Sequence, residues 1–256
     1  MRRPRALVAL ALLAFALGVA AAALIGEDDD DASRRGATPP LRTVAPPAVP
    51  PKPAVPATAA SPLGARVLRR VQLRERPNGR VVRAVGKLTG FGSERVLAVV
   101  ARRGRWLGVL SDHVANSRAA WIPADAVELL HEPYRLDVDL SARRLTVRRE
   151  GRVVRRVRVA IGKPGTATPT GRFGVTDVLR IGVGHRAYGC CAIALTGRQP
   201  NIPQGWTGGD RLAIHGTTAS GSIGTPASNG CLRAADADMR WLVKRIRLGA
   251  PVRIRA

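Results

Sequence analysis

The chain has 256 residues, which is room for one or two modest domains. Its 42 lysines and arginines outnumber its 18 aspartates and glutamates, and the net charge is +24. A balance this basic usually indicates a nucleic-acid-binding protein. No nucleic-acid-binding motif is present, however, so nucleic acid is excluded as the expected partner and another anionic surface has to be considered.

The N-terminal segment, residues 1–26, is typical of an export signal. Arg2, Arg3 and Arg5 precede the uncharged run Ala6–Gly26, and the acidic run Glu27–Asp31 follows. As a helix, the uncharged run would span about 31 Å, close to the hydrocarbon thickness of a bilayer. The arginines favour a cytoplasmic N-terminus, with the rest of the chain outside. We expect an uncleaved signal anchor; a signal peptide cleaved near residues 21–23 is the alternative.

The composition of residues 27–64 predicts a linker that is acidic at first and then rich in proline and alanine. Such a stretch cannot bury a core, and we expect an extended, semi-stiff tether. It either holds a folded module away from the membrane or is filler without a length requirement. Its prolines are Pro39, Pro40, Pro46, Pro47, Pro50, Pro51, Pro53 and Pro56.

Residues 65–132 have the rhythm of a small all-β domain, in which short β-rich runs alternate with turn signals. Trp106 and Trp121 are expected to be core aromatics. The segments Arg105–Val109 and Ala120–Pro123 resemble bacterial Src-homology-3-like barrels, which implies a module that binds peptidoglycan beside a wall enzyme. The ligand of this domain is left open. The β-rich runs are Val67-Leu68, Val81-Val82, Val96–Val100, Trp106–Leu110 and Trp121-Ile122.

Residues 134–256 are predicted to be mostly β with one late helix. Apolar residues alternate with polar ones from Leu136 to Ile161, which indicates half-buried strands. Apolar residues at helical spacing, followed by Gly249, predict a helix over Ala234–Leu248. A closing strand around Val252 is expected after it.

Three cysteines are an awkward number for an exported protein. The adjacent pair Cys190 and Cys191 is expected to be two buried thiols, because a vicinal disulfide is strained. A zinc site is the sharper alternative, but the spacing matches no standard zinc motif, so we expect neither a metal nor a cofactor. The alternative site would use His185, Cys190, Cys191, His215 and Cys231.

The most informative segment runs from His215 to Arg233. His215-Gly216-Thr217 follows a short apolar strand, and Ser228-Asn229-Gly230-Cys231-Leu232-Arg233 begins eleven residues after Thr217. A thiol is a useful nucleophile only as a thiolate, so it needs a base, a positive partner or a helix start nearby. A cysteine on a glycine-containing turn would also have backbone N–H groups free to stabilise an oxyanion.

This pattern resembles the signature of the L,D-transpeptidase catalytic domain, the YkuD family of cysteine enzymes that cross-link peptidoglycan. Ile161-Gly162-Lys163 and Thr168–Phe173 also match family segments, and the resemblance covers most of Tyr134–Ala256. The resemblance implies a β-sandwich-like fold and acyl transfer through a thioester. Cys231 would be the nucleophile and His215 the base.

The remaining roles come from the same resemblance. The backbone N–H groups of Gly230 and Cys231 would form the oxyanion hole. Ser228 would either orient the imidazole or cap the turn, and Asn229 would either donate a hydrogen bond to substrate or hold the turn. Many relatives have histidine where this chain has Asn229, so the role of base falls on His215 alone. Arg233 would either neutralise a stem carboxylate or brace the turn. Residues that would contact substrate are Arg233, Gly216, Thr217 and Tyr188.

The expected function is therefore a peptidoglycan L,D-transpeptidase at the extracytoplasmic face of the cytoplasmic membrane. Its partners would be stem peptides, anionic envelope polymers and, through the N-terminal helix, the membrane. The alternatives are an L,D-carboxypeptidase or a protein-to-wall attachment enzyme on the same fold, and a catalytically inactive wall-binding protein. The sequence does not choose the acceptor, because pocket shape selects it.

Overall fold

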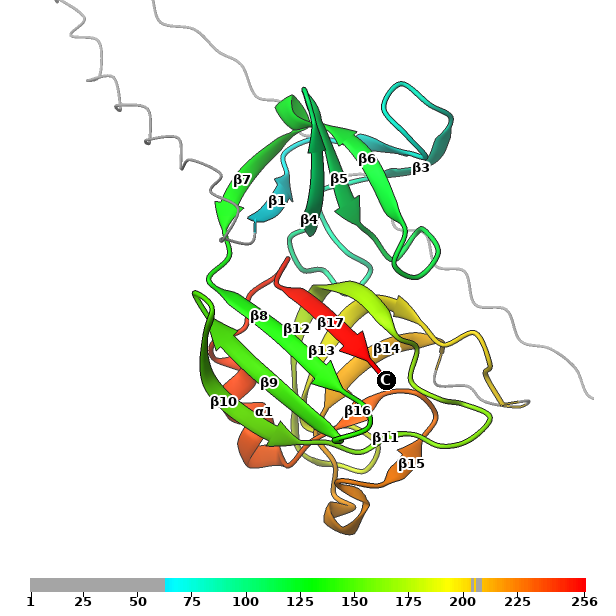
Figure 1. Ribbon diagram of the computed structural model, residues 1–256, viewed down its shortest axis with the longest axis vertical. Helices are drawn as coiled ribbons and strands as arrows, with labels where there is room; N and C mark the ends of the chain where they lie inside the picture. The colour runs from blue at the N-terminus through cyan, green and yellow to red at the C-terminus, as the bar shows by residue number, and fades with distance from the viewer. Residues whose placement is uncertain (1–62, 204, 206–208) are drawn as a thin grey trace, which may run out of the picture. The chain divides into compact units, whose positions relative to one another are not determined.

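The computed structural model describes residues 63–256 apart from 204 and 206–208 (Figure 1). The described residues form seventeen strands and one α-helix, which confirms the prediction of a mainly β chain with a late helix. The predicted signal segment 1–26 and almost all of the linker lie outside the described residues. No helix within the described residues is long and apolar enough to cross a bilayer.

The first sheet has seven strands in the order β3-β2-β6-β5-β4-β1-β7, with antiparallel pairing. Four of the five predicted β-rich runs lie inside its strands, and Val67 ends the first one. Trp106 and Trp121 are both buried, as expected of core aromatics. The likeness to Src-homology-3-like barrels stays a prediction. The elements are β1 (Leu63–Val67), β2 (Val71–Arg74), β3 (Val81–Val85), β4 (Val96–Arg103), β5 (Trp106–Leu110), β6 (Ala119–Pro123), the 3-10 helix η1 (Ala124–Ala126) and β7 (Val127–His131).

The second sheet has eight strands in the order β10-β9-β8-β17-β12-β13-β14-β16 (Figure 1). Most neighbours are antiparallel, but β8 pairs with β17 and β14 pairs with β16 in parallel. Two short strands of the same part of the chain, β11 and β15, form a separate parallel pair. The elements are β8 (Tyr134–Asp139), β9 (Arg144–Arg149), β10 (Arg152–Arg158), β11 (Ile161–Gly162), β12 (Gly171–His185), β13 (Gly189–Arg198), β14 (Arg211–His215), the 3-10 helix η2 (Ser220–Ser222), β15 (Pro226–Ser228), β16 (Leu232–Arg233), α1 (Asp236–Val243) and β17 (Pro251–Arg255).

Alternation of side chains explains why β8 and β9 have one buried face each. Leu136 and Val138 in β8, and Leu145 and Val147 in β9, are at most 1% exposed, whereas their neighbours are partly or fully exposed. Successive side chains of a strand point to opposite faces, so this pattern buries one face only. The core continues through Phe173, Ile193, Ile214 and the helix residues Met239 and Leu242.

The helix α1 is shorter than predicted at both ends. Ala234 pairs with the sheet and does not join the helix, because its N–H donates to the carbonyl of His215 at 2.9 Å. At the other end, Gly249 and Ala250 pair with Val175, so the chain has to leave the helical path after Val243. Pairing with the sheet therefore overrides the helical periodicity of the sequence.

Cys190 and Cys191 are joined by a disulfide, so the prediction of two thiols is wrong, although both residues are buried. The register between β12 and β13 shifts between the pairs Arg180–Cys191 and His185–Gly189. This irregularity relaxes the strict alternation that would hold adjacent side chains on opposite faces. The disulfide removes both sulfurs as thiolate ligands for the alternative zinc site, and the described residues hold no cluster of three metal-binding side chains.

Candidate active site

His215 and Cys231 lie on neighbouring parts of the second sheet. His215 is the last residue of β14, and Cys231 comes immediately before β16. Because β14 and β16 pair in parallel, with Ile214 opposite Leu232, the sheet brings the two segments side by side. Both residues line a single cavity of about 140 Å³.

Most of the residues predicted for the site line the cavity, but Gly230 and Gly216 do not. Gly216 is confined by Asp236, because a Cβ at this position would lie 2.1 Å from Asp236 Oδ1. The motif therefore needs glycine after the histidine for close approach of a carboxylate. The predicted residues that line the cavity are Tyr188, His215, Thr217, Ser228, Asn229, Cys231 and Arg233.

His215 is held as a neutral imidazole. Its side chain is buried, and burial lowers its pKa to about 4; the charge of Arg233 adds to this effect, and the hydrogen bond with Gly216 opposes it. Nδ1 lies 2.7 Å from the carbonyl oxygen of Gly216. That acceptor assigns the proton to Nδ1 and leaves Nε2 as the basic nitrogen. The ring of Tyr188 stands edge-on to the imidazole, with 5.1 Å between ring centroids.

Burial raises the pKa of the Cys231 thiol, while a hydrogen bond at the Ala213 backbone and the charge of Arg233 lower it in part. The sulfur lies 3.7 Å from the carbonyl oxygen of Arg211, so the thiol packs against β14. The side chain is therefore a protonated thiol at neutral pH. With a neutral His215 in the same cavity, the pair at rest is uncharged.

Ser228 closes the turn that carries the cysteine. Its hydroxyl accepts from the N–H of Gly230 at 3.1 Å and donates to the carbonyl of Cys231 at 2.6 Å. Ser228 is only 2% exposed, so these bonds are shielded from water. Of the two roles considered for Ser228, the contacts match the turn cap. They also occupy the Gly230 amide, which was predicted as an oxyanion donor and in this structure bonds Ser228 instead.

A second layer of contacts holds the same turn from behind, and the sequence pointed to only part of it. Thr168, in the segment that resembles the family, donates to the carbonyl of Gly230 at 2.8 Å. The amide of Gln199 reaches the carbonyls of Thr166, Ala167 and Asn229 at 3.1, 3.0 and 3.4 Å. Gln199 belongs to no motif, so no sequence signal could have singled it out.

Arg233 provides a positive charge at the cavity. Its backbone is fixed by Ala160, which exchanges hydrogen bonds of 2.8 and 3.1 Å with it. Its Nε is buried and has no hydrogen-bond partner among the described residues. A buried donor without a partner carries a free-energy cost. As a cation in the cavity wall, Arg233 is suited to contact an anionic group.

Comparison with known proteins gives one family. Residues 133–254 match the YkuD family, whose model is described as an L,D-transpeptidase catalytic domain. Proteins of Bacillus subtilis and Bacillus licheniformis, each named as a candidate L,D-transpeptidase YkuD, are 30% identical over 122 residues and 32% identical over 129 residues. Each match covers 48% of this chain and 66% of the relative, just under two thirds of its length.

The solved structures that are similar to this chain have lower sequence identity to it. An L,D-transpeptidase from Mycobacterium tuberculosis H37Rv is 17% identical, with a TM-score of 0.41 over 56% of this chain and 67% of that chain. The protein Bd1075 of Bdellovibrio bacteriovorus is 25% identical, with a TM-score of 0.38 over 48% of each chain.

Proposed function

Residues 133–254 belong to the YkuD family of L,D-transpeptidase catalytic domains, and from this premise we propose that the chain is a peptidoglycan L,D-transpeptidase that works through a cysteine thioester. The observation that carries the proposal is the cavity shared by Cys231, a neutral His215 and the cation of Arg233. These are a nucleophile, a base and an anion-binding group in one enclosure, as acyl transfer requires.

The first half of the reaction is acylation of Cys231. His215 Nε2 takes the thiol proton as the sulfur attacks the carbonyl at the L-centre of diaminopimelate in a donor stem. The resulting tetrahedral intermediate collapses, the carbon–nitrogen bond to the terminal D-alanine breaks, and His215 returns the proton to the leaving amine. A thioester on Cys231 remains. A neutral imidazole is the required starting form, and burial supplies it.

The second half transfers the acyl group to an amine. The side-chain amine of a second stem attacks the thioester and gives a proton to His215. The thiolate leaves and is reprotonated from the imidazolium, so cysteine and histidine end as they began. The product is a direct bridge between two diaminopimelate residues.

The developing oxyanion needs a donor. Because the amide of Gly230 already bonds Ser228, we assign this role to the amide of Cys231. Arg233, which lines the cavity, would bind a stem carboxylate through its guanidinium. Asn229, Thr217 and Tyr188 would form the substrate-facing wall.

The alternatives differ in what takes the acyl group or in whether transfer occurs. Water as acceptor would make the chain an L,D-carboxypeptidase, and a protein amine would make it a wall-attachment enzyme. A catalytically inactive wall-binding protein would not need a neutral imidazole beside a free thiol. The retained pair of His215 and Cys231 favours an active enzyme.

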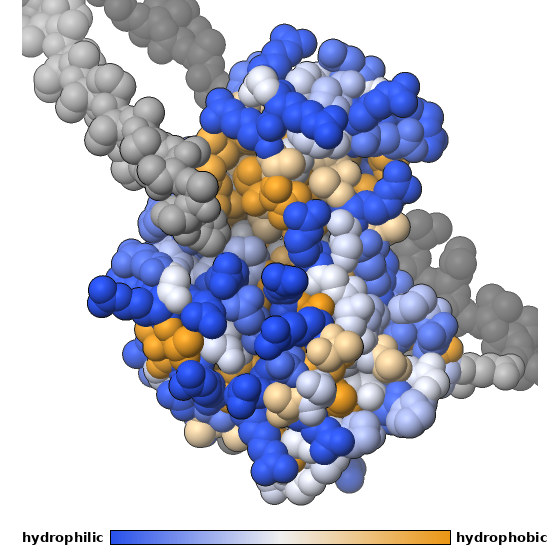
Figure 2. Space-filling view, in the orientation of Figure 1, coloured by the Kyte–Doolittle hydropathy of each residue, from blue (hydrophilic) through white to orange (hydrophobic). Residues whose placement is uncertain are grey.

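The proposed location is the extracytoplasmic face of the membrane, with residues 1–26 as the anchor and residues 27–64 as the tether. The basic charge of +24 suits anionic envelope polymers. On the face drawn in Figure 2, hydrophilic side chains cover most of the surface between smaller apolar areas. Exposed arginines of β10, namely Arg152, Arg156 and Arg158, belong to this hydrophilic class.

One experiment tests nucleophile and substrate together. One portion of the protein is incubated with a carbapenem and its intact mass is measured, and a second, untreated portion is incubated with a tetrapeptide-bearing muropeptide. We expect a covalent adduct on Cys231 in the first portion and release of D-alanine in the second. Cys231→Ala should form no adduct and stay folded, whereas Cys190→Ser and Cys191→Ser should keep at least part of the activity. An adduct on Cys231→Ala would refute the assignment.

A further inference from the structure

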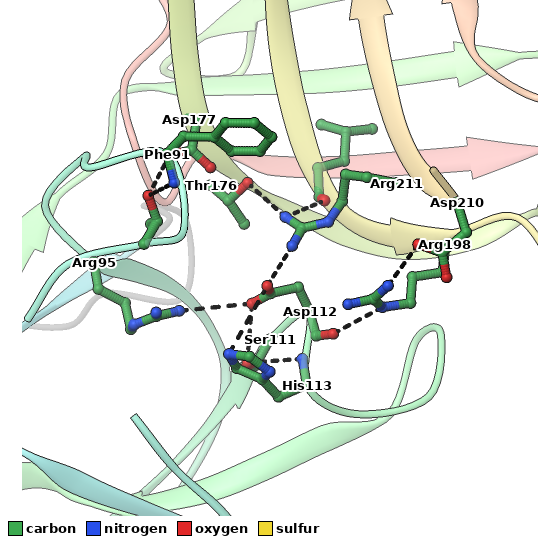
Figure 3. A network of polar contacts seen from close by, with 12 residues as sticks. Phe91, Arg95, Ser111, Asp112, His113, Thr176, Asp177, Arg198, Asp210 and Arg211 are labelled. Atoms are coloured by element: carbon green, nitrogen blue, oxygen red, sulfur yellow. Dashed lines mark hydrogen bonds and ion pairs between the residues drawn. The ribbon is translucent and has the colours of Figure 1, made fainter. Parts of the chain in front are cut away.

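A buried carboxylate outside the second sheet bonds an arginine that lines the cavity. Asp112 follows β5 in the first sheet and is 8% exposed. As Figure 3 shows, its Oδ2 bonds the guanidinium of Arg211, and its Oδ1 lies 3.6 Å from Arg95 Nη1. Its backbone carbonyl accepts from Arg198 Nε at 3.1 Å. Asp112 thus contacts arginines of β13 and β14 as well as one of its own sheet.

Arg211 links this carboxylate to the nucleophile. It is the first residue of β14, and its carbonyl oxygen lies 3.7 Å from Cys231 Sγ. Its side chain also bonds Thr176 Oγ1 at 3.2 Å. Of the described residues, Asp112 is the single carboxylate in ion-pair contact with Arg211. Removal of Asp112 would therefore leave a part-buried cation beside the cavity without its counter-charge.

The strands are irregular where this contact is made. The pairing of β13 with β14 goes from Ala194–Ala213 to Arg198–Arg211, a shift that leaves extra residues on β13. Asn116 bonds both backbone groups of Arg198 from outside the sheet, at 2.9 Å to its N–H and 2.7 Å to its carbonyl. Contacts from residues 111–118 thus support the end of the ladder, where regular pairing is interrupted.

We infer that Asp112 is a positioning residue for acyl transfer, fixing through Arg211 the end of β14 against which the Cys231 thiol packs. The inference rests on the proposed function. It makes the first sheet part of the catalytic apparatus, because one of its carboxylates determines where the nucleophile lies. Asn116 assists by holding the neighbouring strand.

The test is the rate of Cys231 acylation at saturating carbapenem, at a temperature at which circular dichroism shows each variant folded. Asp112→Asn keeps the size of the side chain and removes its charge. We expect the rate to fall at least about tenfold, since a misplacement of about 1 Å can cost about 100-fold. Asp112→Glu restores the charge and should recover most of the rate. Acylation of Asp112→Asn at the wild-type rate would overturn the inference.

Two further variants serve as a control and as an independent test. Asp125→Asn removes an exposed carboxylate of the same part of the chain, paired with Arg69, and should react at the wild-type rate. Asn116→Ala loses both bonds to Arg198 without stranding a buried charge, and should also react more slowly. If Asp112→Asn does not fold, an unaffected Asn116→Ala overturns the inference.

Alkylation by iodoacetamide separates this inference from the proposed function, because it needs only the thiol. A wild-type protein that is alkylated at Cys231 but never acylated would refute the proposed function. Positioning is then judged from the pH profile of alkylation. If loss of the Asp112 charge loosens the end of β14, the sulfur packs less tightly there, burial raises the pKa of the thiol less, and the midpoint moves to lower pH. An unchanged midpoint in Asp112→Asn would overturn the inference.

Discussion

Replacing Gly230 with alanine should lower the free energy of unfolding by more than the strained backbone conformation alone would. Gly230 has φ +119°, and a Cβ there would lie 2.3 Å from Gln199 Nε2. The strained backbone costs about 1–3 kcal/mol for any residue with a side chain. The Gln199 amide, which is 4% exposed and braces three carbonyls, would also have to move. At about 0.5–1.5 kcal/mol for each of its two donated hydrogens, that displacement adds roughly 1–3 kcal/mol.

Gly182→Ala is the matched control. Gly182 has φ +103°, and a Cβ added there would meet no neighbouring side chain or backbone within 4 Å, so the variant carries the backbone cost without the clash. Urea unfolding followed by tryptophan fluorescence gives the free energy of unfolding of both variants. We expect Gly230→Ala to be less stable than Gly182→Ala by roughly 1–3 kcal/mol. Equal losses in the two variants would refute the argument that Gln199 braces the turn.

Three other outcomes are expected. His215→Gln should slow acylation by about 10²–10⁴-fold, the contribution of a positioned base, and Asn229→Ala should cost much less; the reverse order would contradict the division of roles. Burial raises the pKa of Glu132 from 4.5 to about 7, so the folded state holds this proton more tightly. The free energy of unfolding should then fall by on the order of 3 kcal/mol between about pH 4.5 and 7, and Glu132→Gln should remove that dependence in urea titrations at several pH values. An anchored protein should stay in the membrane pellet at high salt, which screens ionic attachment, whereas a mature N-terminus near Leu24, with protein in the salt wash, would show cleavage.

The sequence predicts what local pattern controls. Alternation in the sequence predicted the buried faces of β8 and β9, and the spacing of His215 and Cys231 predicted two residues that the structure brings to one cavity. For Ser228 the sequence left two roles open, orienting the imidazole or capping the turn, and the hydrogen bonds of its hydroxyl match the cap.

The sequence pattern could not predict contacts between segments that are far apart in the chain. Gln199 reaches the turn across about thirty residues of chain, and Asp112 reaches Arg211 across 99. Nothing in the residue types nearby signals either contact, because folding and not spacing brings them together. The disulfide was missed for a similar reason, since it depends on a register shift between β12 and β13 that no sequence rule locates.

The disulfide between Cys190 and Cys191 has a consequence for the chemistry of the whole chain. Of the three cysteines, it leaves Cys231 as the single free thiol. In an oxidising compartment Cys231 therefore has no free cysteine in its own chain with which it could form an inactivating disulfide. A thiol titration of the unreduced protein then counts nucleophiles directly, at one equivalent per molecule, and any shortfall measures the fraction that is oxidised or acylated.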